Sequence, residues 1–267
     1  MKAAINGITL AYDDKGTGFP IVFLHAFPFN RTMWQHQVDT LSSRFRTVSI
    51  DLRGHGESDA PVWRYSLDQY ADDVQGLLSH LSIRQAMFVG LSMGGYLEFA
   101  LCRKYPKLIR GLVLADTRAE GDKPEQARWR FDLAQRTATK GATAVIDEML
   151  PKLLSPKTYT DRPELVDRVK GIMAAAPIAG IVGDLMALAE RPDSTTLLAT
   201  VSVPTLVIVG SDDGLTTPAD AERIAKGIPG AKLVIIPDAG HLSNMEQPEH
   251  FNRALEAFVA DLSSSHD

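Results

Sequence analysis

The stretch Gly90-Leu91-Ser92-Met93-Gly94 decides the fold class of this chain. It follows the apolar run 86–89 and precedes a segment of helical period, so it predicts a strand, a sharp turn and a helix. A turn this tight forces Ser92 into a cramped backbone conformation, and Gly90 and Gly94 remove side chains that would collide there. We therefore expect the Ser92 hydroxyl to be exposed, with amides of the helix start available to stabilise negative charge beside it.

Two groups that match Ser92 in chemistry follow strand-like runs further along the chain. The apolar run 205–209 leads into a turn with two aspartates, and the run 232–236 leads into a loop that ends at His241. A serine hydroxyl becomes a good nucleophile only when a base removes its proton, and His241 is the candidate for that base. The resulting imidazolium needs a carboxylate to hold its tautomer and to stabilise its charge.

Three aspartates compete for the role of this carboxylate. Asp213 is favoured because it lies further round the turn from Gly210, whereas Asp212 is expected to satisfy amides of the turn. Asp116, at the end of another strand-like run, is the fallback. Its structural alternative is a cap for the start of the segment that follows it.

The other histidines are assigned to the scaffold or the surface. His25 and His55 follow predicted strands and could approach Ser92, but the segments that hold them are better explained by a structural role than by a catalytic one. The segment 51–58 is expected to be a structural turn in which Asp51 and Arg53 pair locally.

Composition bounds the size of the protein and the classes of partner to expect. A length of 267 residues suits a single large α/β domain, and 45% hydrophobic with 23% charged residues is ordinary for a globular protein. The net charge of −5, with Lys and Arg scattered along the chain, gives no reason to expect a nucleic acid or an anionic membrane surface as partner. Composition does not predict the oligomeric state.

Targeting and cofactor signals are weak throughout. The one cysteine, Cys102, cannot form an internal disulfide, and the N-terminal residues lack the apolar stretch of a signal peptide, so a cytoplasmic location is expected. Histidine and cysteine show no metal-ligand spacing, and there is no glycine-rich phosphate loop. We expect neither a metal nor another cofactor.

Strand-like and helical segments alternate along most of the chain, which predicts a doubly wound, mainly parallel sheet. The expected strands are 8–12 at an edge of the sheet, 20–24, 47–50, 86–89, 108–114, 205–209 and 232–236. The expected helices are 67–81, 96–105, 219–227 and 249–262.

One long interval interrupts this alternation. Residues 118–195 have apolar positions at helical spacing, broken by several prolines, and are interpreted as a helical cap inserted into a core domain of residues 1–117 and 196–267. The cap is expected to cover the serine and to select the acyl group. Its expected apolar pocket residues are Trp129, Met149, Leu150 and Met186. Three cap arginines could meet a substrate carboxylate but are interpreted as solvated surface charges: Arg128, Arg130 and Arg191.

Five motifs together resemble the α/β-hydrolase fold family over nearly the whole chain. They are His25-Ala26-Phe27-Pro28, the segment 51–58, the serine turn 90–94, the acid turn Gly210-Ser211-Asp212-Asp213, and Gly240-His241. In this family the acid is the third residue after the glycine, which selects Asp213. The resemblance departs at Ala26, where the family often has glycine.

The resemblance implies a cofactor-independent serine hydrolase with an oxyanion hole made by the amides of Phe27 and Met93. Residues 241–248, together with the segment 25–28, are similar to 3-oxoadipate enol-lactonases and related carboxylesterases. The expected reaction is hydrolysis of small or medium carboxylic esters or lactones through an acyl-enzyme. The alternatives are an enol-lactonase specifically, a cofactor-free haloperoxidase or perhydrolase that uses the same triad, and a binding protein with vestigial catalysis.

Overall fold

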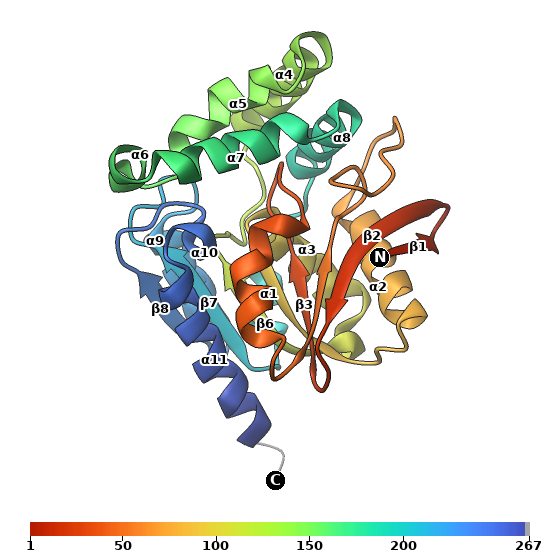
Figure 1. Ribbon diagram of the computed structural model, residues 1–267, viewed down its shortest axis with the longest axis vertical. Helices are drawn as coiled ribbons and strands as arrows, with labels where there is room; N and C mark the ends of the chain where they lie inside the picture. Colours follow the sequence, from red (N-terminus) through yellow and green to blue (C-terminus); the bar gives the residue numbers. More distant parts are fainter. Residues whose placement is uncertain (265–267) are drawn as a thin grey trace.

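The computed structural model describes residues 1–264 and is built around one eight-stranded sheet (Figure 1). The strand order is β1-β2-β4-β3-β5-β6-β7-β8, and all pairs from β4 to β8 are parallel. The strands are β1 (Lys2–Ile5), β2 (Ile8–Lys15), β3 (Pro20–Leu24), β4 (Arg46–Ile50), β5 (Ala86–Leu91), β6 (Ile109–Ala115), β7 (Thr205–Gly210) and β8 (Lys232–Ile236). The expected mainly parallel sheet is confirmed.

Helices cover both faces of the sheet, which explains why the central strands are continuous apolar runs. Every residue of β5 and β7 is buried. In Figure 1, α1 (Gln35–Leu41) and α11 (Pro248–Ser264) lie in front of the sheet, and α2 (Leu67–His80) and α3 (Met93–Lys104) lie behind it. The remaining helices beside the sheet are α9 (Pro218–Gly227) and α10 (Ser243–Glu246).

The N-terminal edge of the sheet differs from the expectation. The expected edge strand extends from Ile8 to Lys15 and pairs on both sides, while β1 forms the edge and pairs antiparallel with β2. The two strands are joined at Asn6 and Gly7, whose φ values of 48° and 77° fit a tight hairpin turn. An Asn-Gly pair between apolar residues is a strong hairpin signal that the sequence interpretation overlooked.

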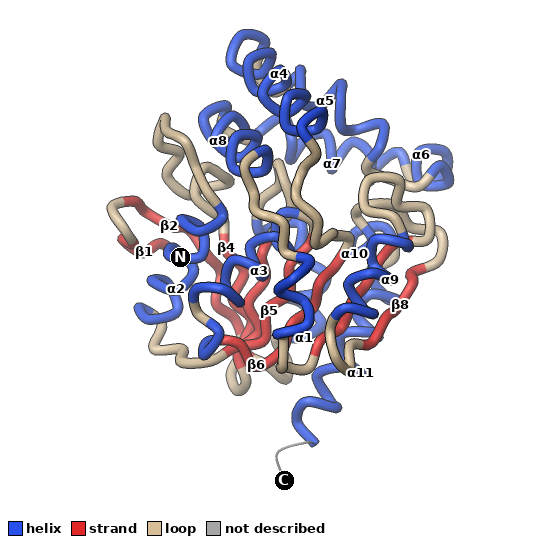
Figure 2. Tube along the Cα trace, turned by 180° about the vertical axis from the view of Figure 1, so that it is seen from behind, coloured by secondary structure: helices blue, strands red, loops and turns tan. Residues whose placement is uncertain are grey.

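The long interval between β6 and β7 forms a layer of helices over the carboxyl ends of the strands (Figures 1 and 2). These helices are α4 (Pro124–Lys140), α5 (Thr143–Met149), α6 (Pro156–Asp161), α7 (Pro163–Ala175) and α8 (Ile178–Ala189). Among the described residues no single helix is long and apolar enough to cross a membrane. Only α7 and α8 taken together, bent by 94°, reach that length and composition.

A buried polar cluster fastens α8 to the core. The Asp184 carboxylate lies 3.0 Å from His55 Nε2 and also accepts a hydrogen bond from the Tyr70 hydroxyl. A Cβ atom at Gly180 would lie 1.8 Å from the Gly54 carbonyl oxygen, so the two backbones meet without room for a side chain. The cap is therefore anchored on the turn 51–58.

Within this turn the expected local pairing of Asp51 with Arg53 is wrong. The Arg53 guanidinium instead makes two hydrogen bonds of 2.8 Å to Asp73 on α2, and Asp51 pairs with Arg31. A buried charge pairs with the opposite charge that packing brings beside it. Here α2 supplies the partner of Arg53, and the segment after β3 supplies the partner of Asp51.

Glu98 is a buried acid on α3. Its side chain is fully buried, and neither carboxyl oxygen has a hydrogen-bond partner of normal geometry among the described residues, although the Gly90 backbone lies near enough to act against the effect of burial on the pKa. Burial raises the pKa of Glu98 well above its ordinary value. The folded protein therefore keeps this carboxyl protonated at a pH where the unfolded chain has lost the proton.

We expect the free energy of unfolding to fall as the pH rises above the ordinary glutamate range, because the folded state binds a proton there that the unfolded state has lost. Each unit of difference between the folded and unfolded pKa is worth about 1.4 kcal/mol. Glu98→Gln cannot ionise, so the variant should become more stable relative to the native protein at pH 8 than at pH 5. Urea unfolding at the two pH values measures this change. The exposed Glu125→Gln variant is the control, and an equal pH dependence of all three proteins would contradict the prediction.

Candidate active site

Ser92 occupies a strained turn between β5 and α3. Its φ of 56° and ψ of −107° are rare for a residue with a side chain. A Cβ atom at Gly90 would lie 2.4 Å from the Gly94 carbonyl carbon, and one at Gly94 would lie 2.2 Å from the Leu24 carbonyl oxygen. The two glycines are therefore required by contacts across the turn and with β3.

A continuous hydrogen-bonded chain joins the side chains of Ser92, His241 and Asp213. Ser92 Oγ lies 2.9 Å from His241 Nε2, and His241 Nδ1 lies 2.8 Å from Asp213 Oδ2. With a proton on Nδ1, the ring donates to Asp213 and leaves Nε2 free to accept the serine proton. The structure thus brings together the three residues that the sequence analysis favoured.

The electrostatics of the pair suit a base supported by an anion. Burial acts to lower the pKa of His241, but the facing Asp213 carboxylate outweighs burial and raises it. Burial acts to raise the pKa of Asp213, and the attraction to His241 turns the net shift downward. Asp213 therefore stays ionised and stabilises a proton on the ring.

The carboxyl group of Asp213 is held by its own turn. Oδ1 accepts hydrogen bonds from the amides of Leu215 at 2.8 Å and Thr216 at 2.9 Å, and Oδ2 accepts one of 2.6 Å from the Thr216 hydroxyl. The expectation that Asp212 satisfies the turn amides is wrong. Among residues 1–264, its carboxylate accepts only from the Ser211 hydroxyl, and the residue is exposed.

Asp116 contacts neither His241 nor the start of the inserted segment. Its Oδ1 accepts a hydrogen bond of 2.8 Å from the Gly210 amide, and its Oδ2 lies 2.5 Å from Ser243 Oγ. Its expected alternative role as a helix cap is therefore wrong. The side chain turns back toward the neighbouring strand ends instead.

The loop that carries His241 is tied to the cap by Glu246, a residue that sequence reasoning did not single out. Glu246 Oε1 accepts from the Gly240 amide at 2.7 Å, and Oε2 accepts from the Ser155 amide at 2.8 Å and the Thr158 hydroxyl at 2.6 Å. The His241 amide itself donates to the Leu153 carbonyl at 2.9 Å. The position of the base thus depends on the segment between α5 and α6.

Two backbone amides are available beside Ser92. Within residues 1–264, neither the Phe27 amide nor the Met93 amide donates to another group of the chain. Phe27 and Ser92 line the same cavity, and Met93 is the first residue of α3. Free amides at a helix start are suited to hold a developing oxyanion.

A cavity of about 150 Å³ opens over Ser92 and His241 under the cap. Trp129 and Met149 belong to its lining, whereas Leu150 and Met186 do not. Leu150 directly follows Met149 and so points about a quarter-turn away, and Met186 lies two positions before the lining residue Leu188, on the opposite side of α8. The other lining residues are Phe27, Tyr96, Arg118, Asp122, Gln126, Arg130, Lys152, Leu215 and Thr216.

The cavity wall is more cationic than expected. Asp122 pairs with Arg130 and, at 2.6 Å, with the buried Arg191, whose guanidinium lies 4.3 Å from the ring centre of Tyr96. Arg130 and Arg191 are therefore not solvated surface charges, while Arg128 is exposed. Arg118 was missed, although its place three residues after the end of β6 could have revealed it, since such loops reach the carboxyl edge of the sheet.

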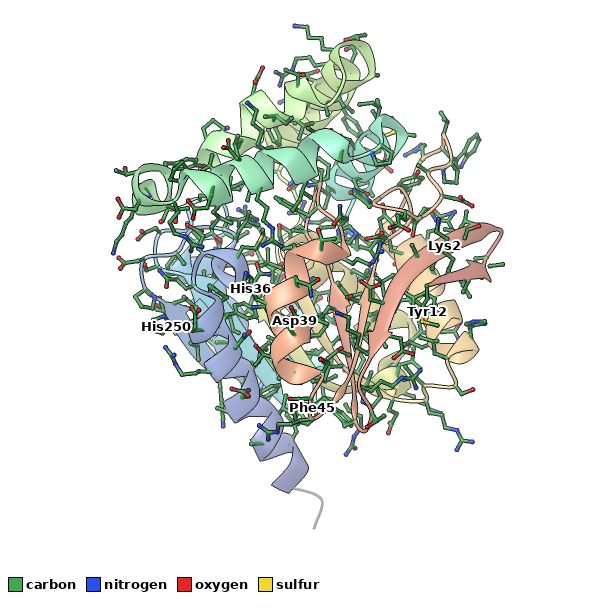
Figure 3. All side chains as sticks on the ribbon, viewed as in Figure 1. Lys2, Tyr12, His36, Asp39, Phe45 and His250 are labelled. Atoms are coloured by element: carbon green, nitrogen blue, oxygen red, sulfur yellow. The ribbon has the colours of Figure 1, made fainter. Side chains whose placement is uncertain are left out.

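The remaining chemistry-bearing residues lie elsewhere. His36 on α1 and His250 at the start of α11 are exposed on the outer surface (Figure 3). The ring of His25 accepts a hydrogen bond from the Leu52 amide at 3.0 Å and serves the scaffold. Within the described part of the chain, no group of three His, Cys, Asp or Glu side chains is arranged to hold a metal ion.

Comparison with known proteins gives consistent matches. The profile of a family described as alpha/beta hydrolase fold matches residues 20–248. The chain is 33% identical to 3-oxoadipate enol-lactonase 2 of Acinetobacter baylyi, over 96% of this chain and 93% of the relative. Among solved structures, a thermophilic esterase from Thermogutta terrifontis superposes with a TM-score of 0.96 at 40% identity, covering 98% of each chain. The enol-lactonase from Burkholderia xenovorans gives a TM-score of 0.91 at 32% identity, covering 97% of this chain and 100% of the other.

The geometry predicts that Ser92 is unusually reactive. A sulfonyl fluoride should label Ser92, and Asp213→Asn should slow labelling by on the order of ten-thousandfold, the cost of losing the acid in serine proteases. Asp212→Asn is the matched control, because its carboxylate does not contact the ring. Mass spectrometry of the labelled peptide over time measures both rates. Equal rates in the two variants would contradict the assignment of Asp213.

Proposed function

We propose, since the chain belongs to the α/β-hydrolase fold family, that it is a serine hydrolase that cleaves carboxylic esters or lactones through an acyl-enzyme. The observation that carries the proposal is the chain of hydrogen bonds from Ser92 through His241 to Asp213. The enol-lactonase and esterase relatives support ester or lactone hydrolysis. The proposal includes a cytoplasmic setting, consistent with the single cysteine.

In the proposed mechanism Ser92 attacks the substrate carbonyl while His241 Nε2 takes the hydroxyl proton. The amides of Phe27 and Met93 bind the oxygen that becomes negatively charged. His241 then gives its proton to the leaving alkoxide, which in a lactone stays attached to the acyl group. Water attacks the acyl-enzyme with His241 again as base, and Ser92 is regenerated.

The proposed division of labour gives this chemistry to the core of residues 1–117 and 196–267. Residues 118–195 act as a cap that selects the substrate, because Trp129, Met149 and Leu188 close the cavity from above. The cavity volume of about 150 Å³ favours small or medium acyl groups. Glu246 and Asp184 support this division, since each fixes a cap segment to the core by buried polar contacts.

The charges of the cavity favour a substrate that carries a carboxylate. Arg118, Arg130 and Lys152 line it, and Asp122 is the one acidic side chain among its described lining residues. Asp122 is already paired with Arg130 and Arg191, so it adds little repulsion toward an anion. The related Thermogutta terrifontis esterase is described with malate, a dicarboxylate, bound. An ester or lactone with a free carboxylate would place that group against the two cavity arginines.

Ser92→Ala should lower turnover of a simple ester such as p-nitrophenyl acetate by about four decades or more, because the members of a triad act as a unit. The fold should persist, since the serine side chain has no packing role that alanine cannot fill. Initial rates and thermal unfolding measured on the same samples test this expectation. A folded alanine variant with native turnover would refute Ser92 as the nucleophile.

Arg130→Gln should lower kcat/KM for monomethyl adipate by about tenfold or more, the value of a hydrogen bond to a charged group, and leave methyl hexanoate nearly unchanged. Arg191 still holds Asp122 in this variant, so the cavity wall keeps its main support. Arg128→Gln is the matched control, since this exposed arginine lies on the same helix outside the cavity. Equal losses for both esters would argue against a carboxylate contact.

A further inference from the structure

Asp116 is fully buried directly behind the proposed triad and has no part in the mechanism above. It follows the last residue of β6 with a φ of 43°, a left-handed conformation that is uncommon for residues with a side chain and that aspartate tolerates better than most. Its amide donates to the Ile208 carbonyl of β7 at 2.8 Å. The backbone of Asp116 is in a sparsely populated region, and both oxygens of its buried carboxyl group have partners. Such positions often have a role in the site that they adjoin.

The two oxygens of Asp116 reach two different loops. Oδ1 accepts from the amide of Gly210, the residue that opens the acid turn and whose carbonyl in turn accepts the Asp213 amide at 3.2 Å. Oδ2 contacts the hydroxyl of Ser243, which lies two residues after His241 and is fully buried. One carboxyl group therefore spans the loops that carry the acid and the base.

The residues on either side of Asp116 hold the third loop. The Ser92 amide donates to the Ala115 carbonyl at 2.9 Å, and the Thr117 hydroxyl donates to the Ser92 carbonyl at 2.9 Å. The strand end 115–117 thus contacts the nucleophile turn with its flanking residues and the other two loops with its central side chain. Other contacts also join the acid turn to the base loop: the Asp212 amide donates to the Ala239 carbonyl at 2.8 Å, and the Thr216 hydroxyl lies 3.1 Å from His241 Nδ1. Asp116 differs from these in that its neighbours in the chain also bond Ser92.

We propose that Asp116 is a positioning residue that sets the spacing of the acid and base loops, and that its two hydrogen bonds rather than a negative charge do so. The inference rests on the proposed function. It assigns Asp116 no contact with substrate, and it differs from a reserve triad acid, which would have to bond the imidazole.

The surroundings of Asp116 support an uncharged carboxyl group. Burial, together with repulsion from Asp213, raises the pKa of Asp116 well above its ordinary value, although His241, Ser243 and the Gly210 amide act in the opposite direction. When the carboxyl is ionised, the Ser243 hydroxyl donates to Oδ2 and the Gly210 amide donates to Oδ1. When Oδ2 is protonated, both contacts can be kept with the carboxyl as donor to Ser243 Oγ. Asparagine offers the same donor and acceptor, so it should replace aspartate at this position.

The test compares Asp116→Asn, Asp116→Ala and Ser243→Ala in the full chain, with p-nitrophenyl acetate as substrate. Asp116→Ala should lower kcat by about ten- to a hundredfold with little change in KM, the cost of misplacing catalytic groups by about an ångström. Ser243→Ala, which loses only one of the two bonds, should lower kcat less. Asp116→Asn should keep kcat within about threefold of the native enzyme, because both bonds are retained.

The pH dependence of kcat/KM separates bonding from charge. The acid limb reports His241, which faces Asp213 and has Asp116 and Arg118 near it; only an ionised Asp116 would raise the pKa of His241. An uncharged Asp116 predicts the same acid limb in Asp116→Asn. If the native residue is ionised, removal of its negative charge lowers the pKa of His241 and moves the limb to lower pH, which would overturn the inference.

Two further outcomes decide the matter. Native kcat in a folded Asp116→Ala variant would overturn the positioning role, and a loss in Asp116→Asn as deep as in Asp213→Asn would make Asp116 a second acid. If Asp116→Ala does not fold, Ser243→Ala and Asp116→Asn still give the comparison. Failure of the proposed function appears separately, as an absence of Ser92-dependent hydrolysis in the native protein.

Discussion

The backbone of Ser92 is the constraint on which the rest of the structure depends. Its φ of 56° costs roughly 1–3 kcal/mol, so neighbouring contacts must hold it in place. Gly90 and Gly94 leave no space for side chains across the turn, and the strand end at Ala115 and Thr117 binds the serine backbone from the next strand. The half-buried Ser92 faces the cavity because these contacts over-determine the turn.

The parallel sheet brings two further residues beside Ser92. Strands β5, β7 and β8 end at the same edge, so the residues that follow them meet although 149 positions separate Ser92 from His241. Strand β6 lies between β5 and β7 and contributes no member of the proposed triad. Its carboxyl end instead carries Asp116, which bonds Gly210 at the end of β7 and Ser243 after β8. The flanking residues Ala115 and Thr117 bond Ser92 after β5.

Charges that are buried in pairs support the helices of residues 118–195 and their contacts with the sheet domain. Asp122 holds Arg130 and Arg191 together at the cavity wall, and an isolated charge of either sign there would be costly. Glu246 and Asp184 also join cap segments to the core, since each carboxylate contacts groups on both. These contacts couple the shape of the cavity to the position of the base, since Glu246 also holds the amide that precedes His241.

The sequence by itself determined the parallel sheet, the serine turn and the candidate triad, because apolar runs, glycine spacing and residue order are local patterns that survive without knowledge of the packing. The hairpin at Asn6 and Gly7 was equally local and could have been predicted. The pairing of Arg53 with Asp73 and the place of Arg118 in the cavity lining became visible only once the elements were packed. A buried charge takes the partner that packing places beside it, and that partner comes from elements whose relative positions no local pattern encodes.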